Sequence, residues 1–192
     1  CINSLDKIIA DYTKNPTAEM LQQGSAENMI GVSKIFRAIV YKRITDTYGD
    51  IPYSEAAKMQ EGIKTPKFDS QESIYKSLIS ELKAGRDMLD DTKTAPKGDV
   101  LYAGTSVGLK KWKKLANSVI LQASLQLSKK YTSASDYAAT EFKGALANSA
   151  GVIEAIADEA WYTYNIDAAV TNPLYAFRAA DYRLSAQLVE SL

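Results

Sequence analysis

The chain has 192 residues, of which 46% are hydrophobic, so it is long enough to bury one core without requiring a second domain. Lys plus Arg and Asp plus Glu each number 23, and a net charge of zero argues against a general nucleic-acid or anionic-membrane binder. The sequence has no His and 1 Cys, which excludes a histidine-based triad, a histidine-ligated metal and an internal disulfide within these residues. We therefore expect one region over residues 1–192 that folds without a metal or organic cofactor, although carboxylates alone could still hold calcium.

Apolar residues recur at helical spacing along most of the chain. The first predicted helical face begins at Ile2, and the last one before residue 150 includes Phe142. The predicted faces comprise Ile2, Leu5, Ile8 and Ile9; Ile30, Ile35, Phe36, Ile39, Val40 and Ile44; Ile74, Leu78, Leu82 and Leu89; Leu109, Trp112, Leu115, Ala116, Val119, Ala123 and Leu127; and Tyr137, Phe142 and Leu146. No apolar run reaches the roughly 18 residues of a membrane span.

Start signals precede several of these faces. Gly24-Ser25 comes before the Ile30 face, and Thr105 or Ser106 before the Trp112 face. Asp69 stands three residues before Glu72, which predicts a capping box at the start of the Ile74 helix. The fourth, shorter helix is expected from about Ser135.

Two segments lack helical periodicity. The aromatic, β-branched run Trp161-Tyr162-Thr163-Tyr164 is expected to form a short strand or an extended loop, and residues 98–104 are expected to be extended as well. Beyond them, Leu184, Leu188, Val189 and Leu192 form an apolar face that stops with the chain, so we expect the chain to be a fragment.

The stretch from Thr45 to Ala56 reads TDTYGDIPYSEA and predicts an ordered connection between antiparallel helices. Gly49 suits a left-handed residue that ends a helix, and Pro52 cannot continue one. Asp50 or Ser54 can accept bonds from free backbone N–H groups. Tyr48 and Tyr53 are expected to pack on the helices and turn their hydroxyls outward. The alternative, a catalytic Asp50/Glu55 pair, is disfavoured because nothing places both carboxylates in a cleft.

Helix–turn–helix order raises the question of repeats. Trp112-x-x-Leu115-Ala116-x-x-Val119 fits the first helix of a tetratricopeptide repeat, with Val in place of Tyr. Ala138-x-x-x-Phe142 fits the second helix but arrives about ten residues late. A large ring followed one turn later by a small residue lets two helices approach closely. The expected fold class is mostly α, with tetratricopeptide-like helix pairs, long loops and little strand.

Several separated motifs resemble the SusD/RagB family of outer-membrane nutrient-binding lipoproteins. They are Arg43-Ile-Thr-Asp-Thr-Tyr-Gly-Asp-Ile-Pro-Tyr-Ser-Glu-Ala56, Pro66-Lys-Phe-Asp-Ser-Gln-Glu-Ser-Ile-Tyr75, Gly98-Asp-Val-Leu-Tyr-Ala-Gly104, Trp112-Lys-Lys-Leu-Ala-Asn-Ser118, Asn172-Pro-Leu-Tyr175 and Asp181-Tyr-Arg-Leu-Ser185. The resemblance spans nearly the whole chain, which covers well under half of a usual family member. It makes Cys1 an internal residue, with the lipid-anchored end expected upstream.

The resemblance implies a helical protein on the outer face of the outer membrane in Bacteroidota. Such proteins bind a glycan, or for some relatives a peptide, and deliver it to a TonB-dependent transporter of the SusC type. The resemblance implies that they bind and transfer the ligand and are not enzymes. The alternative is a helical-repeat scaffold that binds only protein partners.

Ligand residues have to be inferred separately, because the shared motifs belong to the framework. Exposed Trp and Tyr rings stack on the C–H faces of sugars while neighbouring polar groups meet the hydroxyls. Trp161, Tyr162 and Tyr164 form the densest such group, with Tyr175 and Arg178 as a second. The alternative for both groups is aromatic packing in a core or loop.

A basic run surrounds Trp112 and reads Lys110-Lys111-Trp112-Lys113-Lys114. On a helix, lysines that flank one apolar face usually form a solvated surface with their stems over the core. The neutral total charge favours that interpretation over a nucleic-acid patch.

Overall fold

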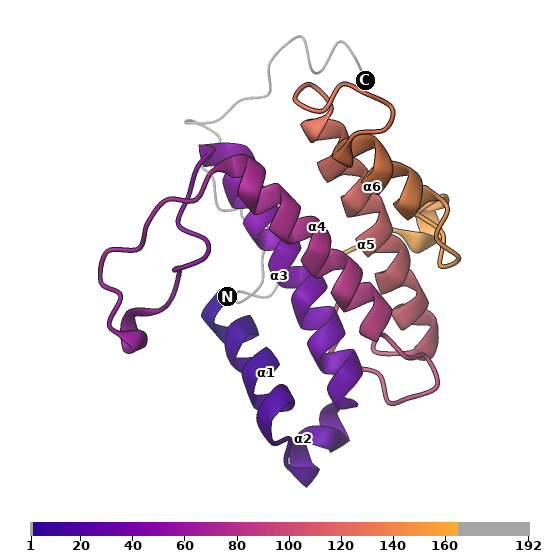
Figure 1. The fold of residues 1–192 in the computed structure, drawn as a ribbon. Coiled ribbons are helices and arrows are strands. Elements are labelled where there is room, and N and C mark those ends of the chain that lie inside the picture. The colour runs from indigo at the N-terminus through magenta and orange to yellow at the C-terminus, as the bar shows by residue number, and fades with distance from the viewer. Residues whose placement is uncertain (1, 165–192) are drawn as a thin grey trace, which may run out of the picture. The chain divides into compact units, whose positions relative to one another are not determined.

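The computed structural model describes residues 2–164, apart from the side chain of Gln60, and Figure 1 shows their arrangement. The chain divides at Ala160 into two units, and of the second, Trp161–Leu192, only residues 161–164 are described. The elements are α1 (Ile2–Lys14), α2 (Ala18–Gln23), α3 (Ala26–Tyr48), the 3-10 turn η1 (Met59–Glu61), α4 (Gln71–Met88), α5 (Ser106–Leu127), α6 (Tyr137–Leu146) and η2 (Ile156–Asp158). The described residues contain no strand, only an isolated antiparallel bridge between Ile51 and Asp69, so the mostly α fold class is confirmed.

Hydroxyl side chains start the long helices. The Ser25 hydroxyl accepts from Asn28 N at the start of α3, and the Thr105 hydroxyl accepts from Gly108 N, 3.0 Å away, at the start of α5. The predicted capping box of α4 is wrong by one residue, because Ser70 is the cap and accepts from Ser73 N. Asp69 does not cap the helix; its carboxylate instead binds the preceding loop.

The helices of the first unit pack in sequence order, with α1 and α4 against α3, α5 against α4, and α6 against α5 (Figure 1). The α3–α4 contact is close because two glycines face each other. A Cβ on Gly31 would lie 2.8 Å from the Gly85 carbonyl oxygen, and a Cβ on Gly85 would lie 2.8 Å from that of Gly31. Any larger residue at either position would push the two helices apart.

The predicted apolar faces form the core, including Ile35, Ile74, Leu78 and Leu109. Trp112 is 2% exposed and stacks edge-on against Tyr102, with ring centroids 5.5 Å apart. Ala116, one turn along α5, is fully buried. The large ring followed by a small residue therefore acts as the repeat pattern predicts, in a tetratricopeptide-like array of helix pairs.

Two segments expected to be extended are not strands. Residues 98–104 form consecutive turns, in which the Asp99 carboxylate accepts from the backbone N–H groups of Leu101 and Tyr102, and Ala103 has a φ of 59°. Asp99 also accepts from the indole N–H of Trp112 at 2.8 Å, so one carboxylate folds the segment and attaches it to α5. Trp161–Tyr164 has no regular secondary structure, so the strand is not observed and the loop alternative stands.

The TDTYGDIPYSEA stretch ends α3 and begins a connection that runs to Ser70. Gly49 has a φ of 75° and its N–H donates to Thr45 O, 2.8 Å away, as predicted for a helix-ending glycine. Asp50 accepts from Gln71 N at 2.8 Å, so it supports the start of α4. Ile51 is buried.

The two tyrosines of this stretch differ from expectation. Tyr48 is 75% exposed and does not pack on the helices. Tyr53 does pack, edge-on against Tyr41 with centroids 4.7 Å apart, but its hydroxyl points inward and donates to Glu81 at 3.4 Å. The prediction of outward hydroxyls is wrong for Tyr53, because a buried carboxylate from α4 needs the donor.

Gly49→Val should lower the free energy of unfolding by about 1 kcal/mol or more, since a β-branched residue is strained at this positive φ. Gly144→Ala is the matched control, because Gly144 lies within α6 and a Cβ there meets nothing within 4 Å. The control should be as stable as the parent or more so by up to about 1 kcal/mol. Urea denaturation followed by circular dichroism measures both, and a valine variant that unfolds like the parent would contradict the assignment.

Candidate functional site

The aromatic group predicted to contact ligand lies at the start of the second unit. Trp161 is 64% exposed, Tyr164 is 46% exposed, and Tyr162 is half-buried. The Tyr162 and Tyr164 rings meet edge-on with centroids 4.9 Å apart. These exposed rings leave faces free for a ligand, so the hypothesis stands as a prediction. Tyr175 and Arg178 lie outside the described residues.

The first unit contains a polar pocket of about 380 Å³ between α1, α3 and the α3–α4 connection, here called the Arg37 pocket. Its lining residues are Asp6, Arg37, Tyr41, Tyr53, Ser54, Ala56, Ala57, Lys58 and Glu61. Both signs of charge, a serine hydroxyl and two tyrosine rings therefore surround one space. Its volume is in the range of small-ligand sites.

Local sequence explains how these side chains converge. Arg37 and Tyr41 are four residues apart on α3, so they lie on the same face of that helix. Asp6 comes from α1, which packs beside α3. The remaining lining residues come from the connection after Gly49, which turns back over Tyr41 through the Tyr41–Tyr53 ring contact.

Arg37 is fixed by two carboxylates. Its guanidinium donates to Asp6 through Nη1, and to Glu81 through Nη2 and through Nε at 2.7 Å. The Glu81 side chain is only 9% exposed, and burial raises the pKa of this carboxyl above its usual value even though Arg37 stabilises the charged form. The pair keeps the guanidinium in one orientation at the pocket wall before any ligand arrives.

The Tyr41 hydroxyl, like the Lys58 and Glu61 side chains, makes no hydrogen bond with the described residues. Tyr41 is 6% exposed overall, but its hydroxyl oxygen is not fully buried. Burial, with the charge of Asp6 as a second cause, raises the pKa of Tyr41, so the hydroxyl keeps its proton. It can therefore donate to, and accept from, a ligand that enters the pocket.

Asp69 holds the wall formed by the connection. Its carboxylate accepts from Ser54 N at 2.6 Å, from the Ser54 hydroxyl at 3.0 Å and from Tyr53 N at 3.2 Å. The bond from the Ser54 backbone lowers the pKa of Asp69 most strongly. The next lining residues include Ala57, a non-glycine residue with a φ of 60°, so this wall is held in a strained conformation.

The arrangement is suited to binding a neutral, hydroxyl-rich molecule. Fixed carboxylate and guanidinium groups can pair with neighbouring hydroxyls, and the tyrosines add apolar surface. No three His, Cys, Asp or Glu side chains within residues 2–164 gather so that they could hold a metal ion. Over the same range, no helix combines the length and the apolar character needed to cross a membrane.

Sequence reasoning missed Arg37 and Asp6. The sequence shows Arg37 as a charged residue between Phe36 and Ile39 on an apolar helix face, which could have indicated a buried ion pair. Its partner, Glu81, is 44 positions away in the sequence and could not be identified from it. The disfavoured Asp50/Glu55 pair has a structural role instead, since Glu55 accepts from Lys67 N, 2.9 Å away.

The basic run on α5 is a solvated face with paired charges. Lys110 pairs with Asp91 at 3.1 Å and Lys114 with Asp158 at 2.7 Å. The Lys111 amine lies 5.9 Å from the centroid of the Tyr102 ring. These partners support the surface interpretation over a nucleic-acid patch.

The sequence profile of the SusD-like family, described as "Starch-binding associating with outer membrane", matches residues 3–192. The chain belongs to the SusD-like family. Several solved structures resemble this SusD-like chain, although no protein of curated function matches it.

A chitin-binding protein is 33% identical with a TM-score of 0.66, covering 83% of this chain and 31% of its own. A SusD-like protein of Bacteroidetes is 30% identical with a TM-score of 0.67, and the match covers 85% of this chain and 27% of that protein. A SusD homolog from Bacteroides uniformis is 26% identical with a TM-score of 0.70, and the match covers 91% of this chain and 32% of that protein. This SusD-like chain therefore spans less than a third of the length of each of these structures.

Acid should weaken this fold partly through Asp69. The pKa of Asp69 is lower in the folded state than in the unfolded chain, where it is about 4. Its contribution to the free energy of unfolding is therefore present above the unfolded pKa and is lost as the pH falls through the folded pKa. Asp69→Asn should be less stable at pH 7 and lose less further stability between about pH 4 and pH 2. Urea denaturation across pH measures this.

The control for this experiment is Asp11→Asn, which removes an exposed aspartate from α1 without removing a bond to the connection. It should retain the acid sensitivity of the parent. Equal acid sensitivity in Asp69→Asn and the parent would show that Asp69 does not hold the pocket wall in the way described.

Proposed function

We propose that this SusD-like chain is part of a cell-surface lipoprotein that binds a glycan and delivers it to a TonB-dependent transporter of the SusC type. Its role is to bind and transfer the ligand without chemical change. The family description, which names starch binding and outer-membrane association, supports the class of ligand and the location. A chitin-binding protein among the similar structures supports testing N-acetylated glycans as candidate ligands.

The observation that carries the proposal is the Arg37 pocket. Sugar recognition requires hydrogen-bonding groups that are already oriented, because each hydroxyl loses water when it binds. Arg37 is held by Asp6 and Glu81, and the Tyr41 hydroxyl has no partner among the described residues. This is a preorganised polar wall beside the Tyr41 hydroxyl.

The exposed rings at the start of the second unit are proposed as further ligand contacts. Trp161 and Tyr164 offer flat apolar faces, and Asn165 and Asp167 follow closely in the sequence.

Outward-facing attachment to the outer membrane is proposed to come from a lipid anchor. Transfer to the transporter is proposed to depend on the whole protein. Co-purification of the full-length protein with a SusC-type transporter would test that part of the proposal.

Replacing Trp161, Tyr162 or Tyr164 with Ala should weaken binding of the glycan by about 1–3 kcal/mol for a ring that is a hot spot, because a stacked face is lost. Helical content should remain unchanged, since none of the three rings belongs to a helix. Isothermal titration with starch, chitin and other oligosaccharides, and with peptides, identifies the ligand and measures the loss.

Tyr48→Ala is the control, because Tyr48 is an equally large exposed ring that belongs to the first unit and lies outside the Arg37 pocket. It should bind like the parent. Normal binding by all three ring variants would remove the aromatic group from the site, and tight binding of peptides alone would contradict the glycan proposal.

A further inference from the structure

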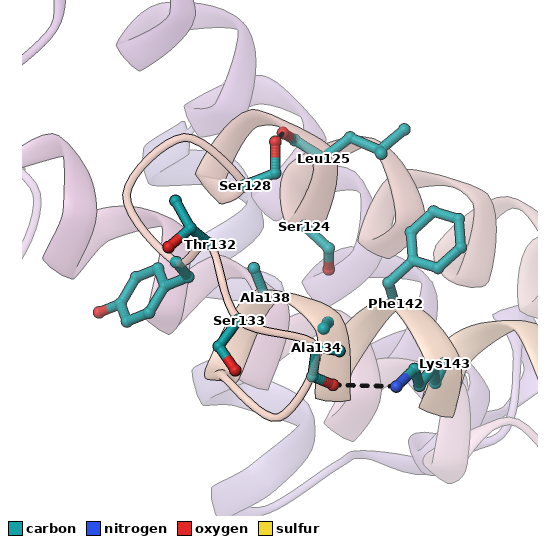
Figure 2. Close-up of a pocket in the computed structure, with 11 residues that line it drawn as sticks. Ser124, Leu125, Ser128, Thr132, Ser133, Ala134, Ala138, Phe142 and Lys143 are labelled. Atoms are coloured by element: carbon teal, nitrogen blue, oxygen red, sulfur yellow. Dashed lines mark hydrogen bonds between the residues drawn. The ribbon is translucent and has the colours of Figure 1, made fainter.

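A second pocket, of about 350 Å³, lies between the C-terminal half of α5, the following loop and α6 (Figure 2). It shares no lining residue with the Arg37 pocket. It is called the α5–α6 pocket below, and nothing in the family motifs or the proposed function accounts for it.

The α5–α6 pocket contains a buried hydroxyl without a partner. Ser124 is 2% exposed, and its Oγ is the only buried side-chain oxygen or nitrogen without a hydrogen bond among the residues that the structure describes. Figure 2 shows its side chain pointing from α5 toward α6. A helical serine usually avoids this cost by bonding to a backbone carbonyl of the preceding turn, as Ser118 does with Lys114 O at 2.9 Å. Ser124 is therefore available to a hydrogen-bonding group in the pocket.

The surface beside Ser124 is apolar and shaped by small residues. Ala138 and Ala139 come from the first turn of α6, and Phe142 lies one turn further along. Figure 2 shows the Phe142 ring beside α5 and α6. Leu125 completes this surface from α5 and is 59% exposed. A methyl group fits such a surface better than a hydroxyl, which would lose its water without finding a partner.

The rim of the pocket carries hydroxyl groups and no carboxylate. Thr132, Ser133 and Ser128 belong to the lining, and the Ser128 hydroxyl donates to Leu125 O at 2.6 Å. The single charged side chain in the lining, Lys143, already donates to Ala134 O at 2.9 Å (Figure 2). The pocket thus favours a neutral ligand that combines an apolar group with a few hydrogen-bonding groups.

We propose that the α5–α6 pocket binds the acetamido group of an N-acetylated sugar. The acetyl methyl packs on Ala138, Ala139 and Phe142, and the amide bonds to the Ser124 hydroxyl. The rim hydroxyls face the sugar ring. This inference rests on the proposed glycan-binding function and names an N-acetylated glycan as the ligand class.

The test compares two trisaccharides with the same linkage, tri-N-acetylchitotriose and cellotriose, which carry acetamido and hydroxyl groups respectively at the same ring carbon. Isothermal titration of the full 192-residue chain should give at least tenfold tighter binding of the N-acetylated sugar. Ser124→Ala should reduce the affinity for tri-N-acetylchitotriose at least fivefold and leave that for cellotriose unchanged. Ala138→Leu, which fills the pocket, should remove the preference altogether.

Ser77→Ala is the matched control. Ser77 is also a helical serine, but it is exposed, its hydroxyl donates to Ser73 O at 3.0 Å, and it lies outside the α5–α6 pocket. This variant should bind both sugars like the parent. Circular dichroism of every variant separates loss of binding from loss of fold.

Methyl NMR spectra locate the contact independently of affinity. N-acetylglucosamine titrated into chain labelled at alanine methyl groups should shift the Ala138 and Ala139 signals, and glucose should not. The α5–α6 proposal is overturned if a glycan binds but the Ala138 and Ala139 signals do not shift, or if the Ser124→Ala variant binds like the parent. Either result would leave the proposed function intact. A chain that binds no glycan in the panel would overturn both.

Discussion

The ion pair between Arg37 and Glu81 is the interaction on which the arrangement of the first unit depends most. One guanidinium on α3 reaches a carboxylate on α1 and a nearly buried carboxylate on α4, and so joins three helices. Removing one partner of such a buried pair is costly, because the remaining charge has lost its water without gaining a substitute. The Tyr53 hydroxyl donates to the same Glu81, so the α3–α4 connection is attached to this pair as well.

The same constraint prepares the site. A guanidinium in water samples many orientations, whereas Arg37 is held before a ligand arrives, which reduces the entropy lost on binding. Asp69 adds a second fixed point by accepting from consecutive backbone N–H groups of Tyr53 and Ser54. Residues that stabilise the fold therefore also line the proposed binding site, and the motif around Tyr53 belongs to both.

Much of the helical framework could be predicted from the sequence. The periodic apolar faces gave the core, and Trp112 with Ala116 indicated the close helix packing, because these signals lie within one or two turns of a helix. Gly49 was readable for the same reason, since a helix end followed by Pro52 leaves few conformations.

The parts that could not be predicted involve side chains that choose distant partners. Asp69 looked like a helix cap, but its carboxylate is used by Tyr53 and Ser54, so the cap passes to Ser70. Tyr53 turns inward because Glu81 lies behind it. The Arg37 pocket has the same origin. Its lining comes from α1, α3 and the connection, and no local pattern records that convergence.

We propose that a glycan binds at the Arg37 pocket of the first unit and, as a separate proposal, that the Trp161 rings of the second unit contact glycan. The chain has two tryptophans, which gives a built-in control, because Trp112 is buried with its indole N–H bonded to Asp99 while Trp161 is exposed. Nitrogen-15 NMR during a titration with the glycan selected by calorimetry resolves both indole signals and the Arg37 Nε–H signal. The Arg37 proposal predicts a saturable shift of the Arg37 signal and a constant Trp112 signal, and the Trp161 signal tests the aromatic group independently. Saturable binding that leaves the Arg37 signal unchanged would contradict the Arg37 proposal.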